Sequence, residues 1–425
     1  MAKGRLICGI DIGTSKVSTI IASLMEETGK INVIGVANFP SVGLRKSQIV
    51  DIEEAIGAIT QSVEAAERMA GCAVSKAFVS ISGSHIQSQN SKGVVAVAEP
   101  EGEISMEDVS RVIEAARAIS LPASREILHV IPRGFIVDSQ EGIKDPMGMT
   151  GVRLEVETHI VTGSSTAMKN LVKCIQELGI DIEGLVFSGL AASDAVLTDT
   201  EKELGVCLVD IGGGTTSIAL FIEGSLAYSA VLPVGAKNIT NDLAIGLRVS
   251  LASAEKIKKA LTEKRKILKK KDEEDELDLS KLGLEENVAS VSRKTVVDGI
   301  IQPRLKEIFQ MAGEELKKSG YGGGTPAGIV ICGGGAQTAG IIQVCKRTLS
   351  LPVRTGTPGG LSGLIDEIKG PDFSVGQGLI LYGIKNFEGA SRPSFSLAKI
   401  GNVLGRIPAK GAVHKAIDFV KSFLP

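Results

Sequence analysis

Two stretches of the chain share one pattern of apolar runs and glycine-containing turns. They span residues 6–37 and 205–235, and in each a short apolar run ends at an aspartate, Asp11 or Asp210, that an Ile-Gly pair follows. Short apolar runs bounded by turn residues are typical of strands. Each copy therefore predicts a strand, a turn, a second strand, a short turn and a third strand. The repetition predicts two similar lobes that face each other.

Helical spacing of apolar residues follows the strand patterns. Asp51 is placed to cap a helix over 52–69 that ends at Gly71. Ser105 opens a capping-box pattern, with an aspartate three positions later, and predicts a short helix to about residue 118. A further helix is expected over 168–178. Because strands and helices alternate along the chain, the predicted fold class is α/β.

Composition narrows the functional classes. The 425 residues carry 47 Lys and Arg against 49 Asp and Glu, with no Trp and 3% aromatic residues, so no nucleic-acid partner is expected. The six cysteines lack metal or redox spacing and predict buried, reduced thiols. Asp11 interrupts the first apolar run, which does not resemble a signal peptide. The uncharged stretch 319–345 contains nine glycines and predicts a loop, a strand and a turn rather than a membrane span.

The two glycine turns after the paired aspartates carry the most informative polar residues. Glycines let backbone N–H groups approach an anion, neighbouring hydroxyls add donors, and a lysine adds a point charge to the β/γ-phosphates. Two carboxylates that face a polyphosphate need a cation between them, so we expect Mg²⁺ at Asp11 and Asp210, held partly through water. The expected phosphate-binding residues are Gly13, Thr14, Ser15, Lys16, Gly212, Gly213, Gly214, Thr215 and Thr216.

A third glycine cluster, Gly333, Gly334 and Gly335, follows a run of branched apolar residues. It fits a nucleoside that lies against the backbone, although a plain strand-to-helix turn has the same pattern. Glu255 and Lys258 are three residues apart on a helical stretch and share a face. They are expected to hold a ribose or the edge of an adenine, and the alternative is a surface ion pair.

Two charged segments stand apart from the rest. Residues 264–278 combine a basic and an acidic run and predict a solvated helix end with an exposed loop, or else a docking surface. Residues 391–425 hold six Lys or Arg against one Asp and follow a Ser/Pro linker. Their helical spacing predicts a basic amphipathic helix that lies on an anionic membrane surface, with self-packing or partner binding as alternatives. The membrane-facing candidates are Val413, Ile417, Phe419, Val420, Phe423 and Leu424.

The order of these pieces resembles the superfamily of actin, sugar kinases and DnaK-type chaperones, and within it the FtsA family of bacterial cell-division proteins. Chaperones and sugar kinases share only the glycine turns with this chain. The full set of matching segments is specific to the FtsA family. The resemblance covers about residues 5–386 and the tail. The segments that carry it are 9–17, 148–155, 159–162, 195–198, 201–206, 210–216, 239–240, 254–255, 333–337 and 351–354.

The resemblance implies a two-lobed actin-like (ribonuclease H-like) fold with ATP and Mg²⁺ in the cleft. It implies a first lobe at 1–83 and 163–204, a small inserted α+β subdomain at 84–162, a second lobe at 205–236 and 326–388, a second-lobe subdomain at 237–325, and a linker and tail at 389–425. It further implies that the protein polymerises, works with other division proteins at the inner face of the membrane at the division site, and receives the C-terminal peptide of the tubulin-like protein FtsZ. Arg293, Lys294 and Arg304 are the basic candidates for that acidic peptide, and ordinary surface charges are the alternative.

One residue departs from the family pattern. Ser217 stands where many relatives have an acidic residue, which predicts ATP binding with slow or negligible hydrolysis, and the sequence marks no general base. Two other classes of protein have the same cleft and remain alternatives. One is an actin-like pilus-assembly protein. The other is a sugar-kinase-type phosphotransferase, which would need a catalytic carboxylate that no motif marks.

Overall fold

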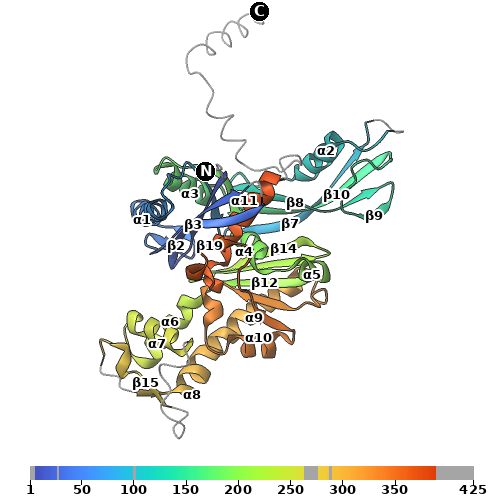
Figure 1. The fold of residues 1–425 in the computed structure, drawn as a ribbon. Coiled ribbons are helices and arrows are strands. Elements are labelled where there is room, and N and C mark those ends of the chain that lie inside the picture. Colours follow the sequence, from blue (N-terminus) through green and yellow to red (C-terminus); the bar gives the residue numbers. More distant parts are fainter. Residues whose placement is uncertain (1–4, 26–27, 99–101, 263–275, 287–289, 389–425) are drawn as a thin grey trace, which may run out of the picture.

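The protein folds into two lobes and one projecting subdomain, each around its own sheet. The computed structural model describes residues 5–25, 28–98, 102–262, 276–286 and 290–388 (Figure 1). In Figure 1 the first lobe and the projecting subdomain lie above the second lobe. No helix within these ranges is long and apolar enough to cross a membrane.

The first lobe is built on a six-stranded sheet in the order β11-β6-β1-β2-β3-β19. Asp51 caps α1 by accepting a hydrogen bond from the backbone N–H of Glu54, and Gly71 ends α1 in the left-handed conformation, which confirms the predicted helix. Helix α3 begins three residues before the predicted position, because Ser164 caps it. The elements are β1 (Arg5–Ile12), β2 (Lys16–Met25), β3 (Lys30–Pro40), β4 (Leu44–Arg45), β5 (Gln48–Ile49), α1 (Ile52–Ala70), β6 (Lys76–Ile81), α3 (Ser165–Gln176), β11 (Asp181–Phe187), α4 (Ser188–Val196) and α5 (Asp199–Leu204), with β19 (Ser362–Gly363) from near the C-terminus.

The projecting subdomain leaves the first lobe after β6 and returns to it at α3. It consists of a four-stranded sheet in the order β7-β10-β8-β9, with α2 packed against β7 and β10. Ser105 and Asp108 form the predicted capping box at the start of α2. Its core is separate from those of the lobes. The elements are β7 (Gln87–Ala96), α2 (Met106–Arg117), β8 (Arg125–Val137), β9 (Gln140–Ile143) and β10 (Arg153–Ser164).

The second lobe repeats the design of the first around a five-stranded sheet in the order β14-β13-β12-β17-β18. A helical subdomain extends from it and contains α6, α7, α8 and α9 (Figure 1). The elements are β12 (Val206–Ile211), β13 (Thr216–Ile222), β14 (Ser225–Leu232), α6 (Ala236–Leu247), α7 (Leu251–Thr262), β15 (Glu276–Asp278), η1 (Ser280–Leu282), β16 (Ser290–Ser292), α8 (Arg293–Val296), η2 (Val297–Ile301), α9 (Gln302–Lys318), β17 (Ile329–Cys332), η3 (Gly334–Gln337), α10 (Ile341–Leu349), β18 (Val353–Thr355), η4 (Asp366–Ile368), η5 (Pro371–Phe373) and α11 (Ser374–Glu388).

The two predicted strand repeats are confirmed, and their registers match. Strand β1 pairs antiparallel with β2 so that Asp11 lies opposite Ser18, and β12 pairs antiparallel with β13 so that Asp210 lies opposite Ser217. In each copy a third antiparallel strand, β3 or β14, completes the unit. The equivalence extends to the turns, because both aspartates stand near the end of a strand that leads into a glycine turn.

The lobes are joined by two helices that lie between their sheets. Helix α4 contacts β6 and β11 of the first sheet and β12 and β13 of the second, while α11 packs on α4 and on β1, β2 and β6. Close approach is possible because small residues line the contact: the Cβ of an alanine at Gly378 would lie 1.9 Å from the carbonyl oxygen of Ala191. The apolar side chains on this face form one cluster that includes residues of both lobes.

The projecting subdomain also contacts the second lobe, at the edge strand β14. The Ser88 hydroxyl donates to the Ser229 carbonyl (2.7 Å), and Asn90 Nδ2 donates to the Ala227 carbonyl (3.3 Å). The ring of His159 lies between Asn90 Oδ1 (2.7 Å) and Ser229 Oγ (2.9 Å). Side chains of β7 and β10 therefore satisfy polar groups on the free side of β14.

One charged segment differs from its prediction. Residues 276–278, expected to be part of an exposed loop, form β15, which pairs with β16. The structure buries Leu277, the lone apolar residue of that acidic stretch, in the core of the second lobe. Residues 263–275 and the predicted tail helix over 409–425 lie outside the described residues.

Candidate functional site

The two glycine turns meet at the interface of the lobes and have the same internal hydrogen bond. The Gly13 N–H donates to the Lys16 carbonyl (3.0 Å), and the Gly212 N–H donates to the Thr215 carbonyl (2.9 Å). The Ser47 hydroxyl connects the turns, at 3.2 Å from Thr14 Oγ1 and 3.0 Å from Thr215 Oγ1. The structure thus brings the predicted phosphate-binding residues of both lobes together.

The turns approach so closely that positions 213 and 214 have no room for a side chain. The Cβ of an alanine at Gly213 would lie 2.0 Å from Ser15 Oγ, and one at Gly214 would lie 2.8 Å from Thr14 Oγ1. Lys237, at the start of α6, adds a further link by donating from Nζ to the Thr14 carbonyl (2.8 Å). Sequence reasoning had not identified Lys237 or Ser47, since neither belongs to a glycine turn.

The paired aspartates, each two residues before the first glycine of its turn, repel each other. Burial, and after it the charge of Asp11, raises the pKa of Asp210 to about 7. Burial also raises the pKa of Asp11, against the lowering effect of a hydrogen bond from Ser80 Oγ (2.7 Å). The thiol of Cys332 donates to Asp210. Neither carboxylate forms an ion pair with a cation among the described residues, so each has a hydrogen-bond partner but no cationic one at contact distance.

This donor set fits Mg²⁺ and a polyphosphate. Carboxylate oxygens are ligands that Mg²⁺ prefers, and two of them leave most of its six positions to water and phosphate oxygens. No group of three or more His, Cys, Asp or Glu that could hold a metal occurs in the described ranges. A bound cation would also offset the repulsion between Asp11 and Asp210.

The third glycine turn lies directly beside the carboxylates. The Cβ of an alanine at Gly333 would lie 2.2 Å from Asp210 Oδ1, and Gly333 has φ 79°, so glycine is required there for space and for backbone conformation. Gly334 and Gly335 continue into the short helix η3. The turn therefore packs against one of the two carboxylates predicted to hold the metal.

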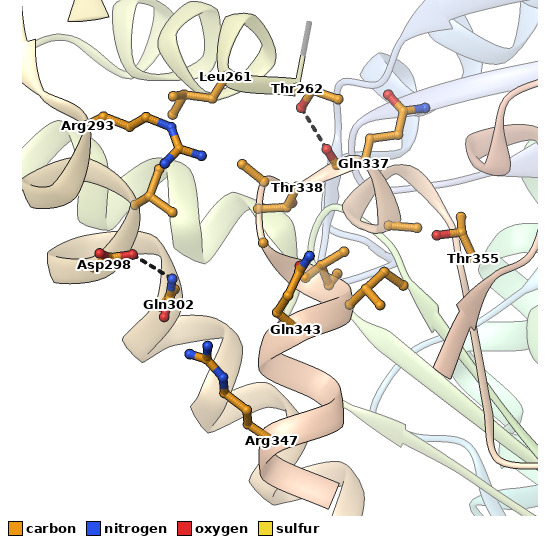
Figure 2. A pocket seen from close by; sticks show the side chains of 16 residues that line it. Leu261, Thr262, Arg293, Asp298, Gln302, Gln337, Thr338, Gln343, Arg347 and Thr355 are labelled. Carbon is orange, nitrogen blue, oxygen red and sulfur yellow. Dashed lines mark hydrogen bonds between the residues drawn. The ribbon is translucent and has the colours of Figure 1, made fainter. Parts of the chain in front are cut away.

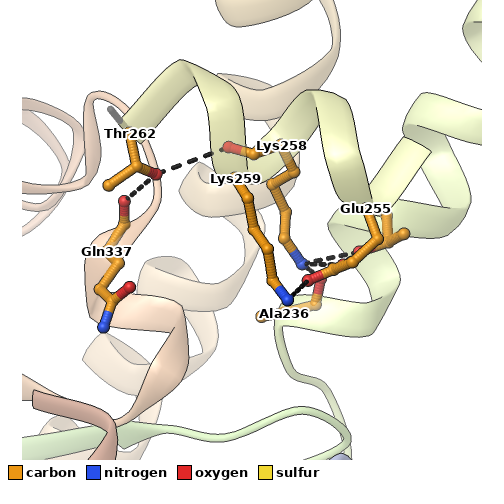
Figure 3. Close-up of polar contacts among 7 residues, drawn as sticks. Ala236, Glu255, Lys258, Lys259, Thr262 and Gln337 are labelled. Carbon is orange, nitrogen blue, oxygen red and sulfur yellow. Dashed lines mark hydrogen bonds and ion pairs between the residues drawn. The ribbon is translucent and has the colours of Figure 1, made fainter. Parts of the chain in front are cut away.

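Helix α7 faces this third turn (Figure 3). Lys258 Nζ lies 2.6 Å from Glu255 Oε2 and donates to Thr240 Oγ1 (2.7 Å). Burial works to raise the pKa of Glu255, but Lys258 and the hydroxyl of Thr240 keep it below its usual value. The predicted shared face of Glu255 and Lys258 is confirmed. Their ion pair is not an ordinary surface pair, because the Lys258 side chain is only 12% exposed. At the end of α7, Thr262 Oγ1 donates to the carbonyl of Gln337 (2.6 Å).

Lys16 has a partner that sequence reasoning missed. Its Nζ lies 2.7 Å from Asp372 Oδ2 and 3.5 Å from the centroid of the Phe373 ring. The other oxygen of Asp372 accepts from Gln337 Nε2 (2.9 Å). The Gly-Pro pair that precedes Asp372 is a helix-start signal, but nothing local in the sequence indicates that it reaches Lys16.

The three basic candidates for peptide binding do not form one cluster. Arg304 is held by Asp242, from Nε to Oδ2 at 2.6 Å, and also pairs with Glu307. Arg293 instead lines a groove of about 670 Å³ between α8, α9 and α10, together with Arg347 and Gln302 (Figure 2). Successive helix positions are 100° apart, so Gln302 and Arg304 point to nearly opposite sides of α9. Lys294 is exposed beside Arg293.

Ser217, the departure from the family pattern, is buried between the lobes. Its hydroxyl lies 3.1 Å from Ser82 Oγ, and it is 2% exposed. A hydroxyl pair at this position supplies no negative charge to orient a water molecule near the phosphate turns.

Comparisons with known proteins bear on the identity of the chain. A family model described as "SHS2 domain inserted in FTSA" matches residues 83–162, and one described as "Cell division protein FtsA" matches residues 207–378. The Cell division protein FtsA of Pseudomonas aeruginosa is 38% identical over 389 residues, which cover 91% of this chain and 92% of the relative. That of Bacillus subtilis is 38% identical over 386 residues, which cover 91% of this chain and 85% of the relative.

Solved structures share the fold at low sequence identity. The "PilM-PilN type IV pilus biogenesis complex" aligns with a TM-score of 0.63 and 16% identity over 89% of this chain and 98% of the other. MreB 5 of Spiroplasma citri bound to AMPPNP aligns with a TM-score of 0.53 and 14% identity over 91% of this chain and 98% of the other. The predicted two-lobed actin-like α/β fold is confirmed. The sequence relatives and family models together show that the chain belongs to the FtsA family of cell-division proteins.

Proposed function

We propose that the chain binds ATP with Mg²⁺ between its lobes. Two observations together carry the proposal. Two equivalent glycine turns converge at the interface of the lobes, and the carboxylate that precedes each turn lacks a cationic partner within the described residues. Gly13, Thr14, Ser15 and Lys16 would contact the phosphates from one lobe, and residues 212–216 from the other. The bound cation would neutralise phosphate charge, while Asp11 and Asp210 would hold it directly or through water. The nucleoside would lie near Glu255, Lys258 and the turn at 333–335.

Calorimetry tests the binding site. Asp210→Ala is expected to abolish Mg-dependent ATP binding, because one of the two carboxylates facing the cation is lost. Asp366→Asn removes a negative charge from a side chain that is 91% exposed and serves as the control. Unchanged ATP affinity in Asp210→Ala would contradict the placement of the metal and the phosphates.

We further propose that nucleotide binding favours a polymerising state that tethers the FtsZ ring to the cytoplasmic membrane. Support comes from membership of the FtsA family and from the basic, amphipathic sequence of 391–425. One such helix is a reversible anchor, since each Lys or Arg near anionic lipid adds about 1 kcal/mol, and a row of subunits multiplies the attachment. Deletion of 391–425 should leave an ATP-binding protein that no longer floats with anionic vesicles. Flotation of the truncated protein would remove the anchor from the proposal.

The FtsZ peptide site is proposed at the helical subdomain of the second lobe. Arg293 and Lys294 are exposed basic candidates, and Arg304 pairs with Asp242 and Glu307. Arg293→Glu should weaken binding of an acidic FtsZ tail peptide in an anisotropy assay and leave ATP affinity unchanged. Arg68→Glu, an equal charge reversal on α1 of the first lobe, is the matched control. Equal peptide binding by the two variants would exclude Arg293.

The proposed rate of ATP hydrolysis is slow or negligible. The hydroxyl pair of Ser217 and Ser82 supplies no base, and Asp372 is bound to Lys16. Phosphorylation of a small acceptor would instead support the phosphotransferase alternative. The pilus-assembly alternative rests on fold similarity at 16% identity, whereas the two FtsA relatives described above are each 38% identical to this chain.

A further inference from the structure

The ion pair between Lys16 and Asp372 joins two segments that are far apart in the chain. Lys16 belongs to the first glycine turn, where the proposed function places the polyphosphate. Its ammonium group is held by the Asp372 carboxylate at 2.7 Å and by the Phe373 ring at 3.5 Å from the centroid. Both side chains of the ion pair are about three-quarters buried, at 22% and 25% exposure, so solvent screens the attraction only in part.

Asp372 is fixed from the side of the second lobe. Its Oδ1 accepts a hydrogen bond from Gln337 Nε2 (2.9 Å), and the carbonyl of Pro371 accepts one from the backbone N–H of Gly333 (2.9 Å). One carboxylate therefore connects the phosphate turn of the first lobe with the third glycine turn of the second lobe. Asp372 differs in this respect from Asp11 and Asp210, neither of which has a cationic partner at contact distance among the described residues.

We propose that Asp372 competes with the polyphosphate for Lys16 and so sets the nucleotide affinity of this chain below what the glycine turns alone would give. The inference rests on the proposed ATP site and assigns a regulatory contact within it. A phosphate group that draws the Lys16 ammonium toward itself lengthens and weakens the ion pair with Asp372. The released carboxylate would then face a polyanion, and the repulsion between them also lowers the nucleotide affinity. Nucleotide binding thus replaces a bridge between the lobes that is made by the protein with one made by the ligand.

The test measures the affinity of Mg·ATP by calorimetry on the full chain and on Asp372→Asn. Asparagine keeps the shape of the side chain and an acceptor for Gln337 but removes the charge that competes. We expect affinity to rise about tenfold, which corresponds to about 1.4 kcal/mol. The control is Asp366→Asn, which removes the same charge six residues earlier, where Asp366 pairs with Lys369 on the surface. Its affinity should equal that of the unchanged protein.

Weaker or unchanged binding by Asp372→Asn overturns the proposal, and weaker binding would make Asp372 a ligand of the nucleotide or its cation. Absence of binding by the unchanged protein would instead refute the ATP site itself.

A second measurement separates competition for Lys16 from charge repulsion. In a Lys16→Met background the gain in Mg·ATP affinity from Asp372→Asn should shrink to less than about threefold, because the ammonium for which Asp372 and the phosphates compete is absent. An equal gain in both backgrounds overturns competition in favour of simple charge repulsion. The rise in melting temperature caused by Mg·ATP gives the same comparison for a variant with low yield.

Discussion

Replacement of Asp210 by Asn should make the nucleotide-free protein more stable while abolishing Mg-dependent ATP binding. Asp210 is 7% exposed and faces Asp11, and its pKa rises from 3.8 to about 7 through burial and this neighbour. A shift of about 3 pKa units corresponds to at most about 4 kcal/mol by which the ionised carboxylate disfavours the folded state. Asparagine has nearly the same shape and still accepts the hydrogen bond from the Cys332 thiol, so most of this cost should disappear.

The pH dependence of the stability difference shows whether the buried charge of Asp210 causes it. Because the folded-state pKa of Asp210 is raised, the folded protein retains a proton that the unfolded chain loses between about pH 4 and pH 7. The contribution of Asp210 to the free energy of unfolding therefore falls as pH rises through this window and is constant above it. Asp210→Asn lacks this contribution, so its advantage over the unchanged protein should grow from pH 4 to pH 7 and then level off.

Urea unfolding at several pH values, followed by circular dichroism, measures this difference. Asp366→Asn serves as the control, because an exposed carboxylate that pairs with Lys369 should give no such advantage. A less stable Asp210→Asn variant at pH 8, or a difference that does not change with pH, would refute the reasoning about burial and repulsion. A melting temperature that still rises with Mg·ATP would refute the metal assignment separately.

Three further substitutions test other contacts. Gly333→Ala places a methyl group against Asp210 in a backbone conformation that alanine disfavours, so it should lower the melting temperature and cost about 2–4 kcal/mol in urea unfolding. Hydrogen bonds from Arg354 lower the pKa of Glu201 to about 2, so Glu201→Gln should lose about 1–2 kcal/mol at pH 7, and the loss should narrow as the pH falls below about 4. Lys258→Met leaves buried polar groups without their cation, and calorimetry should show weaker ATP binding together with about 1–3 kcal/mol lower stability. An unchanged value in any of these assays would contradict the contact concerned.

The sequence predicts the parts of the fold that local chemistry determines. The strand repeats around Asp11 and Asp210 are visible because alternating turns and apolar runs are short-range signals, and the Asp51 and Ser105 caps depend on residues three positions away. The convergence of the two glycine turns follows from the duplication.

Contacts between distant segments could not be predicted in this way. The partners Lys16 and Asp372 are set by how the turn before α11 docks between the lobes, and no spacing in the sequence encodes this. The charge of Arg304 is obvious, but its engagement by Asp242 depends on the packing of α9 on α6. Leu277 is a further example. Local sequence predicts an exposed loop there, but burial of Leu277 in the core accompanies strand formation in part of an acidic run.

The contact of Ser88 and Asn90 with β14 bears on how the protein avoids unwanted association. Strand β14 ends the five-stranded sheet, and an open sheet edge is a template for pairing with another chain. Side chains of the inserted subdomain donate to the carbonyls of Ala227 and Ser229 that such a chain would otherwise use. A chain from which the insertion has been cut out would expose this edge, and such a protein should aggregate through strand addition even if both lobes remain folded.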